Sequence, residues 1–255
     1  MQTDFQPRYD APFKSPLLIL CITVSSICIL ALVLQPIAYR LHWWDFAVVT
    51  LLMQIIALFS FASLILLAVI IQRSIKRQHI SRTIVAATLL PIVLLPLGIP
   101  MSQALRAWAH PFIHDISTDL STPPTFEYAQ QQRNAALNSL LYDPDVAAQQ
   151  REHYPDIDSL FLTLSPQQAF TSALATVQAQ QWQVTYQAEA QGHIEALDTS
   201  PLFNFKDDIV IRIRPAPGGG SQVDIRSVSQ IGKSDLGTNA ERVRQFLRAM
   251  VSRSN

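Results

Sequence analysis

The stretch FKDDIVIRIRPAPGGGSQVDIRSVSQIGKSDLGTN, Phe205–Asn239, decides the fold of the C-terminal half of this chain. Two runs rich in β-branched residues flank a loop of proline and glycine, which is typical of a β-hairpin. With Gly218 at the centre of the loop, Arg212 lies opposite Asp224 and apolar residues face apolar ones. A slip by one residue would destroy these pairings, so the sequence predicts both the hairpin and its register.

This register places four charged side chains on one face of the hairpin, which makes that face a candidate functional surface. They are Asp208, Arg212, Asp224 and Arg226. Such a face is either solvated, with cross-strand ion pairs that contribute little, or a polar binding surface. The neighbouring Asp207 points to the other face, so it cannot act with Asp208 as a paired acid and base without a bulge.

The segments around the hairpin predict more of the same domain. Ser165-Pro166-Gln167-Gln168 combines a capping box with proline at the first helical position, so we expect a helix to about Gln181. Residues 182–188 then alternate apolar and polar, as in a half-buried strand, and residues 193–199 form its partner. An apolar stripe that starts at Leu236 predicts a final helix against the sheet.

The N-terminal half contains apolar runs long enough to cross a membrane. The first has about 23 residues, which at 1.5 Å per residue spans a hydrocarbon core of about 30 Å. The three runs are Pro16–Ala38, Phe46–Ile71 and Thr83–Met101. Prolines in the third run, at positions 91, 96 and 100, predict a helix that is kinked or that unwinds near its end, either as a plain exit from the membrane or as a functional kink.

The basic residues between these runs predict an orientation. Arg73, Lys76, Arg77 and Arg82 separate the second and third runs, whereas Arg40 is the only basic residue between the first two. The positive-inside rule therefore places the N-terminus in the cytoplasm and exports everything after about Met101. We expect a multi-pass protein of the bacterial inner membrane with a periplasmic or extracellular C-terminal domain.

These elements predict the fold class and the domains. The class is α+β: three transmembrane helices, then a soluble domain with a roughly four-stranded antiparallel sheet and two helices on one face. We expect a membrane domain over residues 1–104, an extended linker with a short helix over 105–164, and the exported domain over 165–255. The short helix of the linker is predicted at Glu127–Tyr142, before Asp143-Pro144 breaks it.

Composition excludes several classes of function. The 255 residues include 19 basic and 19 acidic ones, so no net charge attracts nucleic acid. The two cysteines, Cys21 and Cys28, share one face of the first apolar helix and are expected to pack as small apolar residues. His110 and His114 have the spacing of metal ligands on a helix, but Pro111 interrupts that helix, so we expect no metal site.

The C-terminal half resembles a known family. The segments IHDISTDLSTPPTF, YPDI, GHIEALDTS, FKDDIVIRI and VDIRSVSQIGKSDLGTNAERV, between about residues 111 and 251, are similar to the uncharacterised bacterial and plastid domain-of-unknown-function 1499 family. Gln230 stands where this family would have a basic residue. The resemblance implies a small exported or membrane-tethered domain, and it carries over no activity and no catalytic residue.

Two hypotheses for function follow. The first is a non-enzymatic envelope module, surrounded by membrane lipids, that binds another envelope protein or a lipid-like ligand without a cofactor. The alternative is a periplasmic hydrolase built on a cluster of polar residues, although the G-x-S-x-G, H-E-x-x-H and Cys-x-x-Cys signatures are missing. The residues of this candidate cluster are His114, Asp115, Asp207, Asp208, Arg212 and Arg226.

Overall fold

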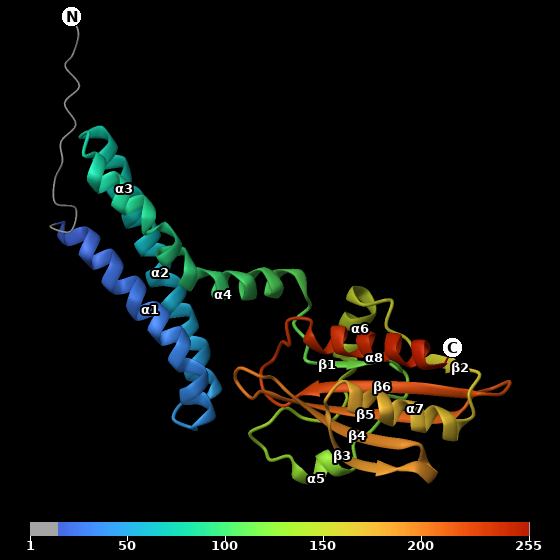
Figure 1. The fold of residues 1–255 in the computed structure, drawn as a ribbon. Helices are drawn as coiled ribbons and strands as arrows, with labels where there is room; N and C mark the ends of the chain where they lie inside the picture. Colours follow the sequence, from blue (N-terminus) through green and yellow to red (C-terminus); the bar gives the residue numbers. More distant parts are fainter. Residues whose placement is uncertain (1–14, 255) are drawn as a thin grey trace, which may run out of the picture. The chain divides into compact units, whose positions relative to one another are not determined.

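The computed structural model describes residues 15–254, which form two compact units with the boundary between Leu105 and Arg106 (Figure 1). The N-terminal unit is helical. Its helices are α1 (Pro16–Arg40), α2 (Phe46–Lys76), α3 (Ile80–Thr88) and α4 (Leu90–Ala109), the last of which continues across the boundary. Because the units are separate bodies, each is described by itself.

The first unit confirms the predicted membrane helices. Three helical stretches are long and apolar enough to cross a membrane: Pro16–Arg40, Phe46–Lys76 and Ile80–Ala109. Inside the unit, Cys21 packs in a small apolar core with Leu18 and Leu67, and its thiol donates to the Ser63 carbonyl oxygen over 3.3 Å. Cys28 is also buried, so both cysteines have the packing role that their spacing predicts.

The third stretch is interrupted where its first proline requires it. Helix α3 ends at Thr88 and α4 begins at Leu90, so the break lies just before Pro91. Proline removes an amide donor and clashes with the carbonyl four residues earlier, which explains this position. Pro96 and Pro100 lie inside α4, which does not unwind there but continues to Ala109.

The C-terminal unit contains a six-stranded antiparallel sheet with the order β1-β6-β5-β4-β3, and β2 also pairs with β6. The strands are β1 (Asp115–Ser117), β2 (Leu160–Leu162), β3 (Gln183–Ala188), β4 (His193–Thr199), β5 (Lys206–Pro215) and β6 (Ser221–Ser229). The four longer strands are the predicted ones. The predicted hairpin register is confirmed, since Arg212 pairs with Asp224 and Ile211 with Ile225.

Helices α7 (Pro166–Ala179) and α8 (Thr238–Ser254) contact each other and cover one face of the sheet. The Ser165–Gln168 capping box is present at the start of α7, as predicted. Apolar side chains of both helices meet those of the central strands in the main core. Phe170, Val177, Ile209, Ile211, Ile225, Val243 and Phe246 belong to this core.

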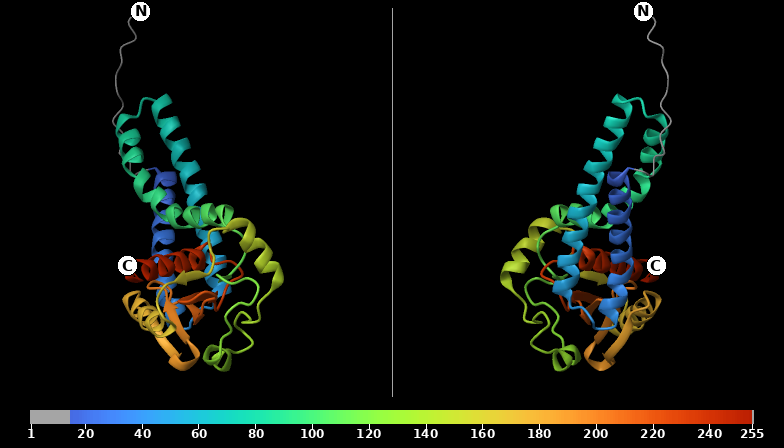
Figure 2. Two further views of the ribbon diagram at one scale, coloured as in Figure 1. Left: turned by 90° about the vertical axis from the view of Figure 1, so that its right-hand side faces the viewer. Right: turned by 90° about the vertical axis from the view of Figure 1, so that its left-hand side faces the viewer.

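The other face of the sheet is covered by the chain between β1 and β2, so α5 and α7 lie on opposite sides of the strands (Figure 2). This segment, expected as an extended linker, instead contributes β1, α5 (Tyr128–Gln132), α6 (Pro144–His153) and β2 to the unit. Phe126 and Ala129 pack on Val210 and Val228 of the central strands.

The prediction of a helix over Glu127–Tyr142 is wrong in its extent, because only Tyr128–Gln132 is helical. Two side chains explain why the helix stops. Arg133 binds Asp208 on the sheet, and the Asn138 amide donates to the carbonyl oxygens of Ser229 and Gly232. These long-range bonds fix the chain in an irregular path across the sheet.

Candidate functional site

The predicted polar surface lies on the sheet face opposite α7 and α8, under the segment between β1 and β2. It is therefore mostly withdrawn from water. Asp224 is fully buried, Arg226 is 2% exposed and Asp208 is 6% exposed. Because a buried charge is tolerated only with partners, the question is which groups satisfy each residue.

Arg226 is held by partners on every side. Its Nε and Nη2 atoms donate to the two Asp115 carboxylate oxygens over 2.9 and 2.7 Å. Nη1 donates to the carbonyl oxygen of Pro124 and Nη2 to that of Leu140. The guanidinium carbon also lies 5.4 Å from the centre of the Phe126 ring and 5.0 Å from that of Tyr142. Arg226 thus anchors the covering segment to the sheet.

Arg212 belongs to a second group of charges at the hairpin end of the same face. Its Nη2 atom lies 2.8 Å from Asp224 Oδ2 and 3.0 Å from Asp119 Oδ2, and Arg214 contacts the same two carboxylates. Ser159 Oγ donates to Asp224 Oδ1 over 2.5 Å. Two arginines and two aspartates leave this group with no excess charge.

The two adjacent aspartates separate as alternation requires. Asp208 lies on the polar face, where it accepts from Arg133 Nη2 over 2.6 Å and from Gln230 Nε2. Asp207 points to the face covered by helices, where it is 2.6 Å from Arg242 Nη2. No shared proton-transfer pair can form between them.

The six residues of the candidate hydrolase cluster are therefore not brought together. Asp115, Asp207, Asp208 and Arg212 each have a different set of ion-pair partners, and only Arg226 is paired with another member, Asp115. The backbone of His114 accepts hydrogen bonds from Ser229 N and Asn239 Nδ2. Two pockets of this unit involve few of the six: one is lined by Arg226, and the other, at the start of α8, by none of them.

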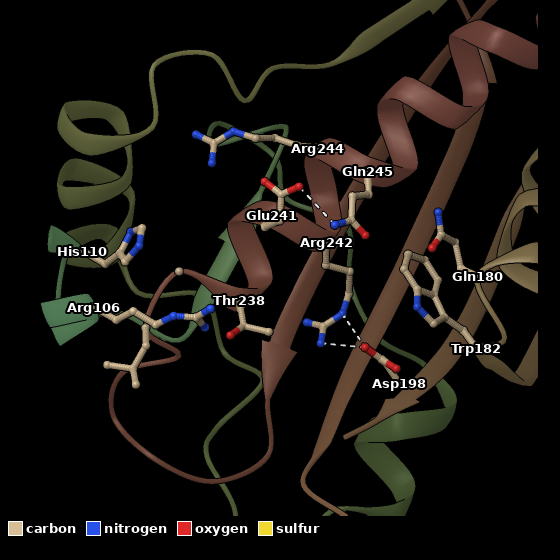
Figure 3. A pocket seen from close by; sticks show the side chains of 12 residues that line it. Arg106, His110, Gln180, Trp182, Asp198, Thr238, Glu241, Arg242, Arg244 and Gln245 are labelled. Carbon is tan, nitrogen blue, oxygen red and sulfur yellow. Dashed lines mark hydrogen bonds and ion pairs between the residues drawn. The ribbon is translucent and has the colours of Figure 1, made fainter. Parts of the chain in front are cut away.

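That pocket, about 550 Å³ in volume, is a site that the sequence did not indicate. We call it the α8 pocket, since the first two turns of α8 supply several of its residues. Its lining residues are Arg106, His110, Gln180, Trp182, Asp198, Leu236, Gly237, Thr238, Glu241, Arg242, Arg244 and Gln245. Figure 3 shows Arg106 and His110 on one side, Trp182 and Asp198 on the other, and Thr238 and Arg242 between them.

The base of the α8 pocket is fixed by Arg242. Its Nη2 atom binds Asp198 Oδ2 and Asp207 Oδ2 over 2.8 and 2.6 Å, and Nη1 donates to Ser227 Oγ and to the Asn239 side-chain oxygen. Trp182, beside it, is 7% exposed and stacks on a core phenylalanine. These contacts hold this side of the pocket in place, and its one arginine is outnumbered by two aspartates.

His110 forms the opposite wall through a close approach to the backbone. A Cβ atom at Gly237, which has a φ of +81°, would lie 2.6 Å from the His110 ring, so only glycine leaves room for it. The ring nitrogen Nδ1 is 3.1 Å from the Tyr154 hydroxyl. Burial, together with the nearby Asp235 carboxylate, raises the pKa of Tyr154 to about 12, so this hydroxyl is protonated at neutral pH.

The remaining arginines of the pocket differ in whether a carboxylate pairs with their charge. Arg244 binds both carboxylate oxygens of Asp156, and Glu241 is paired with Arg248. Arg106 is exposed, and within residues 15–254 no carboxylate lies at ion-pair distance from it. The pocket therefore has its one uncompensated positive charge on the side of His110 and the start of α8.

The described residues provide no set of side chains placed to bind a metal ion. Over residues 15–254, no three histidine, cysteine, aspartate or glutamate side chains lie close enough together to hold a metal ion.

Fold and site together define a class: a protein with three helices long and apolar enough to cross a membrane and an α+β unit whose sheet is covered on both faces. The family model described as protein of unknown function (DUF1499) matches residues 115–250, and the chain belongs to this family. The resemblance noted in the sequence is thereby confirmed. A search of curated proteins finds no match to the chain.

Proposed function

We propose that this protein is a non-enzymatic binding module of the bacterial cell envelope, anchored by its three apolar helices with its C-terminal unit exported. The α8 pocket takes the anionic group of a lipid-like ligand. The observation that carries this proposal is the pocket of about 550 Å³ whose uncompensated charge lies on Arg106.

Electrostatics favours an anion on that side of the pocket. The positive end of the α8 dipole lies at Thr238, but the Asp235 carboxylate already accepts from the Gly237 and Asn239 N–H groups there, so the attraction comes from Arg106. Arg242 contributes no further attraction because two carboxylates, those of Asp198 and Asp207, already pair with it. A phosphate or carboxylate group beside Arg106 and His110 would therefore be stabilised without displacing an existing ion pair.

The connection to the membrane helix favours a ligand from the bilayer. Arg106 lies in the last turn of α4, and His110 follows Ala109, the last residue of that helix. These two residues are thus fixed within a few positions of the end of a segment that can span a membrane. A lipid head group would be available there at high local concentration.

The test is native purification of the full chain followed by mass spectrometry of the lipids that remain bound. We expect the wild type to retain an anionic phospholipid and Arg106→Gln to lose most of it. Arg151→Gln, a change at an exposed residue of α6 outside the pocket, is the matched control. Equal retention by wild type and Arg106→Gln, or no enrichment over the bulk membrane, would contradict the proposal.

A further inference from the structure

A second pocket lies under the segment that covers the polar face of the sheet. Its volume is about 510 Å³, and it shares no lining residue with the α8 pocket. We call it the strap pocket, because nearly all its walls come from residues 123–142, which cross the sheet as a strap. Its apolar lining residues include Pro123, Phe126, Leu137, Leu140, Leu141 and Tyr142.

The strap pocket has no net charge to offer a ligand. Its only charged lining residues are Arg133 and Arg226. Arg133 is 2.6 Å from Asp208, and Arg226 is 2.7 Å from Asp115, so both guanidiniums are neutralised. An anion would gain no uncompensated partner and would lose its hydration, which excludes ions as preferred ligands.

Two aromatic side chains in the wall of this pocket are held in fixed positions. Phe126 and Tyr142 are both fixed against the Arg226 guanidinium, which leaves their rings in defined positions at the wall. Leu141 is 81% exposed beside them. A flat or branched apolar molecule could cover this surface and remove it from water, at roughly 25 cal/mol per Å².

One polar group of the pocket is left without a partner. The Tyr142 hydroxyl oxygen is buried, yet no hydrogen-bond partner lies within reach among the described residues. Burial, reinforced by the Asp115 charge, raises the pKa of Tyr142, so the hydroxyl keeps its proton and can donate it. Because this atom has almost no accessible surface, a small rotation of the Tyr142 side chain must bring it to the pocket wall; a ligand acceptor there would recover the cost of about 1–3 kcal/mol of a buried donor without a partner.

We propose that the strap pocket is a second ligand site, which binds a small uncharged and mainly apolar molecule through a carbonyl or ether oxygen that accepts a hydrogen bond from Tyr142. This site is independent of the anion site at α8. The two can be tested separately because they share no residue.

The test uses two probes of similar shape, 4-fluoroacetophenone, which has an acceptor oxygen, and 1-ethyl-4-fluorobenzene, which has none. Fluorine NMR follows their binding to the full chain in lipid nanodiscs, with empty nanodiscs as the baseline for partition into lipid. We expect saturable binding of the ketone to the wild type. Tyr142→Phe should weaken it by about five-fold, which corresponds to one hydrogen bond, and should not change binding of the hydrocarbon.

Two further variants make the result specific. Tyr128→Phe removes a hydroxyl from α5 outside the pocket and should bind both probes as the wild type does. Ala135→Trp, at an exposed lining position, should fill the pocket and abolish saturable binding while the melting temperature stays the same. No saturable binding to the wild type, or equal ketone affinity in Tyr142→Phe, would overturn the proposal.

Discussion

At the scale of single residues, burial decides what an arginine–carboxylate pair contributes to stability. Arg226–Asp115 and Arg244–Asp156 have the same two-bond geometry. The first pair is 2% and 5% exposed, whereas the second is 26% and 55% exposed. A buried pair loses far more when one member is removed, because the other charge remains in a medium that cannot solvate it.

We therefore expect Asp115→Leu to lower the free energy of unfolding of the C-terminal unit by about 3–5 kcal/mol. Asp156→Leu, the exposed counterpart, should lower it by less than about 1 kcal/mol. Urea unfolding of the full chain in nanodiscs, followed by near-ultraviolet circular dichroism, measures both. The double variant Asp115→Leu/Arg226→Met should recover part of the loss; a double variant as unstable as the sum of its parts would refute this account.

Glu195 provides a pH-dependent link between the sheet and α5. Its carboxylate accepts from the backbone N–H groups of Tyr128 and Ala129 over 2.9 and 2.8 Å, and from His193 Nε2 over 2.9 Å. Burial by itself would raise the pKa of Glu195, but these bonds outweigh it and hold the pKa below its ordinary value of 4.5. The stabilisation is therefore complete above pH 4.5 and is lost as the pH falls through the lowered pKa.

Hydrogen exchange of residues 127–132, detected by mass spectrometry, tests this link. At pH 7 we expect Glu195→Gln to increase exchange about ten-fold relative to the wild type, because an amide offers only one acceptor oxygen to the three backbone donors of Glu127, Tyr128 and Ala129. The difference should shrink as the pH is lowered through the pKa of Glu195, since the wild-type carboxyl then becomes protonated. Glu189→Gln, on an exposed turn, is the control and should change neither value.

The same residues show which contacts a sequence can predict. Arg212 and Asp224 could be paired in advance because a short loop fixes the register of their strands. Asp115 and Arg226 are 111 positions apart, and no local pattern relates them. The α8 pocket was missed for the same reason, since His110, Trp182 and Arg242 come from three distant segments.

At the scale of elements, long periodic segments were predictable and three-residue strands were not. β1 and β2 are too short to show an alternating pattern. They form because the side of β6 that does not pair with β5 is free to pair with other strands at both of its ends. Helix α6 did leave a local signal. Asp143 caps it through the backbone N–H of Asp145, with Pro144 at the first helical position, so the Asp-Pro pair that ends one segment also begins the next.

The hairpin loop explains how β2 can approach β6. Gly218 and Gly220 have φ values of +95° and +77°, and a Cβ at Gly220 would lie 2.1 Å from the Leu162 carbonyl oxygen, whereas one at Gly218 would meet nothing within 4 Å. We expect Gly218→Ala to cost about 1 kcal/mol through its φ alone. Gly220→Ala should cost about 2 kcal/mol more, because β2 must move.

Thermal unfolding of the two glycine variants in nanodiscs measures this difference in stability. Hydrogen exchange locates it, because Gly220→Ala should increase exchange in residues 160–162 and Gly218→Ala should not. Equal melting temperatures for the two variants would mean that the pairing of β2 with β6 does not require a glycine at position 220.

At the scale of the whole molecule, the distribution of charge predicts how the chain crosses the membrane. Arg73 and Lys76 lie in the last turn of α2, and Arg77 and Arg82 follow before the third apolar stretch is complete. The turn between α1 and α2 has Arg40 as its nearest basic residue and Trp43 exposed beside it. Retention of the more basic side in the cytoplasm would export the C-terminal unit.

Reporter fusions test this orientation. A reporter active only outside the cytoplasm should be silent after Arg77 and active after Asn255. Neutralising the basic cluster should produce a mixed population with reduced activity at Asn255, because the charge difference that orients the helices is then lost. The four changes are Arg73→Gln, Lys76→Gln, Arg77→Gln and Arg82→Gln. Arg40→Gln removes a charge from the opposite side and should leave the wild-type pattern intact, whereas activity after Arg77 in the wild type would reverse the orientation and place the α8 pocket in the cytoplasm.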